Sequence, residues 1–249
     1  MTKTAITNRV WDYLGMEPTL NGTGFMYRKL DPYAEAFIEQ ARLEGGLYLD
    51  MGCAYGIASI AALEAGGQVT ACDPEAGHLK ILLENTPEAL RENLLCITDE
   101  LPGLNLPDDR YDAILCSRVL HFLDGSAIDA SVRKMHRWLK PGGRLYLVAD
   151  TPYGIWRRLI PIFEARRERG DRWPGLMIGL ENYLPVEPEA RAVDGSPFMN
   201  LLDPELLTRI CTEADFSIEQ AGFIERTDFR GKARMDGREN AGICAIKPR

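Results

Sequence analysis

The sequence has little of the chemistry that binds metal ions. It contains three histidines, which lie far apart along the chain at His78, His121 and His136. Its six cysteines are scattered, and no two of them form a Cys-x-x-Cys pair. Metal sites in proteins need several such ligands at close spacing. We therefore expect no metal site, and reduced thiols that pack as small apolar side chains.

Long apolar runs and an excess of positive charge are also missing. No stretch of about 18 apolar residues occurs, and the first residues lack the apolar region of a secretory leader. We therefore expect a soluble, cytoplasmic protein without a transmembrane segment. The formal net charge is −8, with 29 Lys and Arg against 37 Asp and Glu. Because Lys and Arg bind phosphate backbones, this balance argues against nucleic acid as a partner.

What the sequence does have is a regular alternation of short apolar runs and helical patterns. The patterns predict strands over residues 47–49, 69–72, 94–98, 111–117 and 144–150. They predict helices between these strands over residues 57–64, 74–83 and 128–139. Such alternation is typical of an α/β fold, with a doubly wound, mostly parallel sheet and helices on both faces. Two apolar stretches near the end, 216–224 and 241–247, add a terminal antiparallel β-hairpin, which gives seven strands.

The rhythm changes after Asp150. Residues 153–170 have the pattern of a long, arginine-rich helix, and residues 171–200 read as irregular, with four prolines. Because long irregular segments in compact domains are usually functional, we interpret them as a lid over a site. We expect a single domain, 1–249, with four parts: an N-terminal helical cap over 1–44, a core over 45–150, the lid over 151–202, and a closing helix and strands over 203–249.

The stretch between Leu47 and Ala62 places a tight turn between a predicted strand and a helix of small residues. The turn reads Asp50-x-Gly52-x-Ala54-x-Gly56, and two positions of the Gly-x-Gly-x-x-Gly pattern of dinucleotide-binding folds are not met. A carboxylate at Asp50 would also repel a pyrophosphate. These features argue against a nicotinamide-dependent oxidoreductase and favour a ligand with a cation or an amine.

Acids also follow the next two predicted strands. Asp73 lies where a carboxylate can accept both hydroxyl hydrogens of a ribose, and Asp99 lies where one can accept from an adenine amine. Three acids along one sheet edge predict a crevice for an adenosine that carries an amino group. Each acid has a structural alternative: Asp73 as a helix N-cap, Asp99 as a solvated loop residue, and Asp50 as a brace for the turn.

Five stretches, in this order, make the sequence resemble the class I S-adenosylmethionine-dependent methyltransferases: LYLDMGCAYG, VTACDP, CITDELPGL, YDAILCSRVLHFL and WLKPGGRLYLV. They cover about residues 45–150, and the two closing strands match the reversed hairpin of the family. The sequence departs from the family at Ala54, where glycine is common. The resemblance implies S-adenosyl-L-methionine as the methyl donor and S-adenosyl-L-homocysteine as its product.

The resemblance also implies a set of cofactor-binding residues. Gly52 and its neighbours would pass beside the methionine part, and Ser117 would lie under the sulfonium. Tyr27 and Arg28 would close over the cofactor, with Arg28 pairing with its carboxylate; for Tyr27, packing on an ordinary amphipathic helix is the alternative. The implied set is Tyr27, Arg28, Asp50, Gly52, Cys53, Ala54, Gly56, Asp73, Pro74, Asp99, Glu100, Leu101 and Ser117.

The chemistry itself requires no particular catalytic residue. The sulfonium methyl is already activated, so the protein mainly has to align the nucleophile and exclude water. His121 is the candidate general base, and a packed or capping histidine is its alternative. The candidate substrate-binding residues are Tyr33, His121, Tyr153 and Trp156. For Tyr153 and Trp156 the alternative is packing in the core, and for Tyr33, as for Tyr27, it is a place on an ordinary amphipathic helix.

The composition of the lid indicates the kind of methyl acceptor. Its Trp, Phe, Met, Leu and Ile residues favour a small, apolar or aromatic molecule, methylated on oxygen or nitrogen. The arginines between Arg157 and Arg172 indicate either an anionic substrate or membrane surface, or a solvated helix face. Two functional alternatives remain: a non-catalytic cofactor-binding or partner module of the same fold, and a methyltransferase of protein or nucleic acid. The three acids argue against the first of these, and the number of subunits, a homodimer included, is left open.

Overall fold

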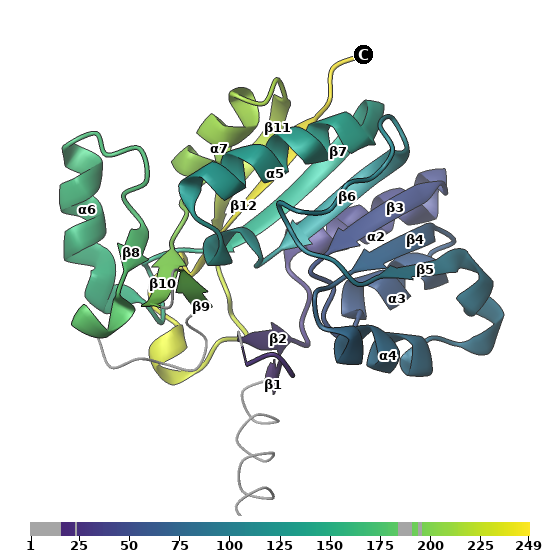
Figure 1. Ribbon diagram of the computed structural model, residues 1–249, viewed down its shortest axis with the longest axis horizontal. Coiled ribbons are helices and arrows are strands. Elements are labelled where there is room, and N and C mark those ends of the chain that lie inside the picture. Colours follow the sequence, from purple (N-terminus) through teal and green to yellow (C-terminus); the bar gives the residue numbers. More distant parts are fainter. Residues whose placement is uncertain (1–15, 23, 184–190, 194–195) are drawn as a thin grey trace, which may run out of the picture.

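A seven-stranded sheet forms the centre of the protein (Figure 1). The computed structural model describes residues 16–22, 24–183, 191–193 and 196–249. The strand order is β11-β12-β7-β6-β3-β4-β5, and the five strands from β3 to β7 are parallel, whereas β12 is antiparallel to both neighbours. The strands are β3 (Leu47–Met51), β4 (Gln68–Cys72), β5 (Leu94–Ile97), β6 (Tyr111–Ser117), β7 (Leu139–Asp150), β11 (Ser217–Ile224) and β12 (Asn240–Ile246). The predicted fold class is confirmed.

Helices cover both faces of this sheet because its strands are apolar on both sides. In β3, Tyr48 packs into one core cluster and Leu49 into the other, as the period of two requires. On one face lie α5 (Gly125–Trp138) and α7 (Pro204–Thr212), and on the other lie α2 (Pro32–Glu44), α3 (Ile57–Glu64) and α4 (Ala76–Asn85) (Figure 1). Short 3₁₀ turns link these elements: η1 (Glu88–Asn93), η2 (Leu120–Phe122) and η5 (Gly231–Ala233).

The segment before α2 differs from the predicted helical cap. Helix α2 begins with Asp31 as N-cap and Pro32 in the first turn. Before it, however, β1 (Met16–Pro18) and β2 (Phe25–Tyr27) form an antiparallel hairpin, so the helical prediction is wrong for these residues. The sequence carries a signal for such a turn, because Asn-Gly pairs favour hairpins and Gly22 has a φ of +67°. Residues 1–15 lie outside the described part of the chain.

The lid is more regular than its sequence predicts. The long helix predicted over 153–170 is instead the 3₁₀ turn η3 (Arg157–Leu159) followed by α6 (Ile160–Glu168), because Pro161 is compatible only with a first helical turn. The segment predicted as irregular contains a three-stranded antiparallel sheet. Its elements are β8 (Leu176–Ile178), η4 (Leu180–Asn182), β9 (Arg191–Val193) and β10 (Ser196–Asn200).

The lid starts and ends at the same point of the central sheet. It leaves the carboxyl end of β7 at Asp150, and on its return the Leu202 N–H donates to the Asp150 carbonyl oxygen at 3.0 Å. In Figure 1 the lid lies on one side, α3 and α4 on the other, and the β1–β2 hairpin between them. No helix among the described residues is long and apolar enough to span a bilayer.

Candidate functional site

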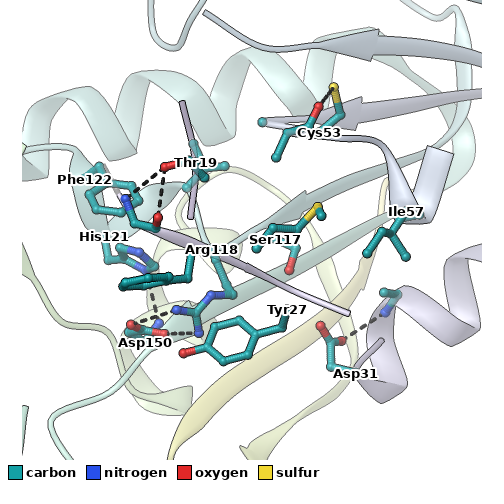
Figure 2. Close-up of a pocket in the computed structure, with 18 of the residues that line it drawn as sticks. Thr19, Tyr27, Asp31, Cys53, Ile57, Ser117, Arg118, His121, Phe122 and Asp150 are labelled. Carbon is teal, nitrogen blue, oxygen red and sulfur yellow. Dashed lines mark hydrogen bonds and ion pairs between the residues drawn. The ribbon is translucent and has the colours of Figure 1, made fainter. Parts of the chain in front are cut away.

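A pocket opens at the carboxyl ends of the parallel strands (Figure 2). Asp50 in β3, Asp73 after β4, Ser117 in β6 and Asp150 in β7 all line it. This is the sheet edge at which ligands bind in open α/β folds. Other segments complete the wall, among them Thr19, Phe25 and Tyr27 of the hairpin, Ile57 of α3, His78 of α4, Phe122 of η2, Ile155, Trp156 and Met199 of the lid, and Arg226 after β11.

The glycine turn brings bare backbone to this pocket. Gly52 has a φ of +72°, and a Cβ built on it would lie 2.2 Å from Cγ2 of Val119, so no side chain fits there. Ala54 adopts a φ of +45°, which explains why glycine is usual at this position. An L-residue in this left-handed region costs about 1–2 kcal/mol. Gly52, Cys53, Ala54 and Pro74 line the pocket, whereas Gly56 supports the start of α3 against Leu82.

Asp73 ties the glycine turn to helix α4. Its Oδ2 accepts the Ala54 N–H at 2.9 Å, and its Oδ1 accepts the Glu75 N–H at 3.0 Å. The His78 ring contributes a third contact, with Nδ1 2.8 Å from Oδ1. The N-cap of α4 is Glu75 rather than Asp73. Since each carboxylate oxygen has two acceptor positions, Oδ2 can still accept from a ligand in the pocket.

Asp50 is a buried carboxylate at the same edge. Its Oδ2 accepts the Ser59 hydroxyl at 2.6 Å, so it braces the side chain of α3. Burial raises the pKa of Asp50 to about 6, the Ser59 hydrogen bond lowers it, and the nearby Asp73 adds to the increase. A cationic ligand beside Asp50 would offset this cost of burying a negative charge.

Five of the predicted cofactor-binding residues do not line the pocket: Arg28, Gly56, Asp99, Glu100 and Leu101. Asp99 is exposed, and its Oδ1 accepts the N–H of Glu100 at 2.7 Å. Leu101 is buried in the core cluster on the α5 face, and the exposed Arg28 contacts Glu17 at 3.8 Å. The roles of these five residues in cofactor binding stay predictions.

Two predicted substrate-binding tyrosines pack away from the pocket. Tyr33 is 5% exposed in α2 and packs so closely on β12 that a Cβ at Gly242 would lie 2.1 Å from its ring. Tyr153 is 2% exposed, its hydroxyl donates to Glu164, and the Arg238 guanidinium lies 3.8 Å from its ring centroid. These environments favour the structural alternatives, an amphipathic helix for Tyr33 and core packing for Tyr153.

His121 lines the pocket but is poorly suited to accept a proton. Its Nδ1 accepts the backbone N–H of Asp150 at 3.2 Å, which assigns the proton of the neutral ring to Nε2. Burial lowers the pKa of His121 to about 4, and Arg118 lowers it further while Asp150 opposes the shift. The ring therefore stays neutral near pH 7 and presents a donor, which favours the capping alternative over a general base.

This environment predicts how His121 affects stability. Its folded pKa is depressed, so the unfolded chain gains a proton below pH 6.5 while the folded protein resists protonation down to about pH 4. Relative to His121→Phe, the wild type is expected to lose about 3 kcal/mol of unfolding free energy between pH 7 and pH 4. Urea unfolding of both proteins at several pH values measures this difference. A difference in unfolding free energy that does not change with pH would contradict the depressed pKa of His121.

Sequence reasoning missed a buried charge network on the lid side of the pocket (Figure 2). The Arg118 guanidinium binds the Asp150 carboxylate through two hydrogen bonds of 2.5 and 3.2 Å. Trp156 Nε1 and Asn240 Nδ2 donate to the same carboxylate at 3.3 and 2.8 Å. Burial would raise the pKa of Asp150, but Arg118 holds it below its usual range. Asp150 could have been found from the sequence, because it ends a predicted strand.

An aromatic ring joins this network to a second buried arginine. The Tyr27 ring centroid lies 4.3 Å from the Arg118 guanidinium and 4.9 Å from that of Arg226. Arg226 is 3% exposed and is held by the Asp228 carboxylate at 2.6 Å. The hairpin, β6 and the segment after β11 therefore meet at one point in the pocket wall. Among the described residues, no three His, Cys, Asp or Glu side chains group to hold a metal ion.

Comparison with known proteins gives the family of this fold and site. Residues 49–147 match the family described as a methyltransferase domain. Over 98% of its length the chain is 30% identical to a ubiquinone biosynthesis O-methyltransferase of Xanthomonas campestris pv. campestris, of which the match covers 91%. It also matches the enzyme of that name from Idiomarina loihiensis, with 32% identity, but over 57% of this chain and about half, 56%, of the relative.

Solved structures show the same fold. The 1,6-didemethyltoxoflavin-N1-methyltransferase of Burkholderia thailandensis, solved with its substrate and S-adenosylhomocysteine, superposes with a TM-score of 0.57. The superposition covers 88% of this chain and 80% of that one, at 18% identity. The chain belongs to the class I S-adenosylmethionine-dependent methyltransferases. It is an enzyme that uses S-adenosylmethionine as its methyl donor.

The pocket fits this cofactor. The left-handed turn at Gly52 and Ala54 exposes backbone to the pocket, as close contact with a ligand requires. Buried carboxylates at Asp50 and Asp73 match the amine and hydroxyl groups of the cofactor, which are hydrogen-bond donors. The elevated pKa of Asp50 also suits a positively charged neighbour.

Proposed function

We propose that the enzyme methylates an oxygen or nitrogen atom of a small apolar or aromatic molecule. The observation that carries this proposal is that the side of the pocket away from the glycine turn is lined by large apolar side chains. Figure 2 places Cys53 and Ile57 on one side, Phe122, His121 and Asp150 on the other, and Ser117 between them. On the second side, Phe122 is joined by the apolar lining residues Ile155, Trp156 and Met199. Pockets lined in this way, with a few polar groups, bind apolar molecules of defined orientation.

The side of the pocket that contains Asp50, Asp73 and the glycine turn would hold the cofactor. Oδ2 of Asp73 would accept a ribose hydroxyl, Asp50 would accept the amino group, and the backbone at Gly52 would pass along the methionine part. When bound, the cofactor supplies a methyl group on a sulfonium, which is an activated electrophile. Because Ser117 lies between the two sides, the acceptor would approach the methyl group from the side of Phe122 and Trp156.

The chain's own residues would orient the acceptor and exclude water. Trp156 and Met199 are buried, and together with Phe122 they remove water from the side where the nucleophile attacks. The Nε2–H of His121 would donate a hydrogen bond to a polar atom of the acceptor, and the ring would keep this proton rather than take one from the acceptor. The Xanthomonas relative is named as an O-methyltransferase, which supports oxygen as the acceptor atom.

A panel of acceptors with a matched pair of variants tests this proposal. We expect methyl transfer to hydroxylated or aminated aromatic compounds, and none to peptides or RNA. Ile155→Asp places a charge on a half-exposed residue of the apolar side and is expected to lower kcat/KM by about tenfold or more, with unchanged cofactor affinity. Ile178→Asp, at an isoleucine of similar exposure that does not line the pocket, is the control. Transfer to peptides or RNA alone would contradict the proposal.

A further inference from the structure

The β1–β2 hairpin forms part of the wall of the pocket. Thr19, Gly24, Phe25, Met26 and Tyr27 line the pocket. Each strand has three residues, and an isolated hairpin of this size is at best marginally stable. Leu20, in the turn between the strands, is 57% exposed, so burial of its side chain adds little. Specific contacts must therefore hold this part of the hairpin in place.

Two hydrogen bonds attach the hairpin to the cofactor side of the pocket. The Tyr55 hydroxyl donates to the Pro18 carbonyl oxygen at 2.6 Å. The Leu20 N–H donates to Nε2 of His78 at 2.9 Å. The Tyr55 and His78 rings also meet edge to face, with centroids 5.0 Å apart. The two bonds differ in one respect, because only His78 also contacts Asp73.

His78 continues the contact from the hairpin to the glycine turn. The ring is 1% exposed, and because Nε2 accepts from Leu20, Nδ1 carries the proton and donates to Asp73 Oδ1 at 2.8 Å. Oδ2 of Asp73 in turn accepts the Ala54 N–H. An unbroken series of hydrogen bonds thus runs from Leu20 through His78 and Asp73 to Ala54. The orientation of the ring, and with it the acceptor offered to Leu20, depends on where the Asp73 carboxylate lies.

We propose that His78 is a positioning residue that couples closure of the β1–β2 hairpin to occupancy of the cofactor site. This inference rests on the proposed placement of the cofactor ribose at Asp73. A ligand that fixes the Asp73 carboxylate also fixes the His78 ring, and this strengthens the hold on Leu20. By linkage, a closed hairpin strengthens cofactor binding by the same factor. The enzyme would then close the wall beside Phe25 and Tyr27 only around a bound cofactor.

Three variants separate this coupling from a purely structural role. His78→Asn keeps a donor near the position of Nδ1 but removes the acceptor for Leu20. His78→Gln keeps an acceptor near the position of Nε2 but removes the donor to Asp73. Tyr55→Phe is the matched control, because it removes the hydrogen bond to Pro18, keeps the ring against His78, and leaves the contact with Asp73 intact.

The measurement is amide hydrogen exchange of β1 and β2, without and with saturating S-adenosylhomocysteine, together with calorimetric titration of that ligand. In the wild type we expect the ligand to slow exchange of the hairpin at least tenfold. Tyr55→Phe should exchange faster than the wild type without ligand, yet show the same fold of protection with it. In His78→Asn the ligand should still bind, but its protection of the hairpin should be lost.

Each outcome decides between the proposals. Equal protection in the wild type and in His78→Asn would overturn the coupling, since direct contact between ligand and hairpin would then explain it. If His78→Asn does not fold, His78→Gln takes its place, and full ligand-induced protection in that variant would overturn the coupling. A wild type that fails to bind S-adenosylhomocysteine, or an Asp73→Asn variant that binds it normally, would instead overturn the proposed placement of the cofactor.

Discussion

Replacement of Asp73 by alanine is expected to weaken binding of S-adenosylmethionine and S-adenosylhomocysteine by at least about tenfold. Oδ2 has one acceptor position left, and one hydrogen bond from a ribose hydroxyl to a buried carboxylate contributes about 1.5–3 kcal/mol, which corresponds to a factor of about 10 to 150. The substitution also leaves the Ala54 and Glu75 N–H groups and the His78 ring without their acceptor. The glycine turn would lose its anchor on α4, so we expect the melting temperature to fall as well.

Asp99→Ala is the matched control for this prediction. Asp99 also follows a strand of the same sheet edge, but it is exposed and does not line the pocket. We expect its alanine variant to bind the cofactor within about threefold of the wild type, because a solvated carboxylate contributes little to binding. Calorimetric titration with both sulfur compounds and with NAD measures the effect. Equal weakening of cofactor binding in the two variants would support the predicted contact of Asp99 with the adenine. Wild-type affinity in both variants would contradict the proposed placement of the cofactor at Asp73.

Arg118→Met should lower the free energy of unfolding by about 3–5 kcal/mol, because it leaves the buried Asp150 carboxylate without its cation. Methionine keeps the apolar stem, and both residues bear the same backbone strain at a φ of +62°. The difference in stability between the two proteins therefore measures the loss of the positive charge. Arg118 holds the folded pKa of Asp150 below its usual range. Asp150 therefore stabilises the wild type above its unfolded pKa, and this stabilisation is lost on acidification through the folded pKa.

The pH dependence sharpens the test of Arg118. In Arg118→Met the pKa of Asp150 should rise, so the difference from the wild type should be largest near pH 7 and shrink in acid as the carboxyl group is protonated. Arg234→Met, which breaks the exposed pair with Glu225, is the control and should cost less than about 1 kcal/mol. Urea unfolding gives both values. Equal costs for the two variants would show that the Arg118–Asp150 pair is not a buried ion pair in solution.

The parallel core and its acidic edge could be predicted from the sequence because both depend on local patterns. Strand β6 and helix α3 have the predicted bounds, since a continuous apolar run and a glycine turn define them. Asp50, Asp73 and Ser117 line one pocket because the carboxyl ends of parallel strands meet at one sheet edge. Knowledge of strand order alone suffices to bring these side chains together.

The rest of the site could not be predicted because it depends on contacts between distant segments. Arg118 and Asp150 are 32 residues apart, and no local pattern shows that they pair. Asp99 also follows a strand, but its side chain is exposed and accepts the N–H of Glu100 in its own loop. The β1–β2 hairpin had a local signal in Asn21-Gly22, yet its strands are too short for a period of two to be recognised.

The pocket is divided between the part of the chain that builds the sheet and segments outside the parallel strands, and this division affects how the substrate of such an enzyme changes in evolution. The residues proposed for the cofactor lie within a contiguous part of the chain that also builds the sheet. Most residues of the opposite side come from three segments outside the parallel strands: the hairpin before α2, the lid after β7 and the segment after β11. On the proposed function, mutations that accumulate in these segments would exchange one methyl acceptor for another, while the cofactor requirement is inherited unchanged.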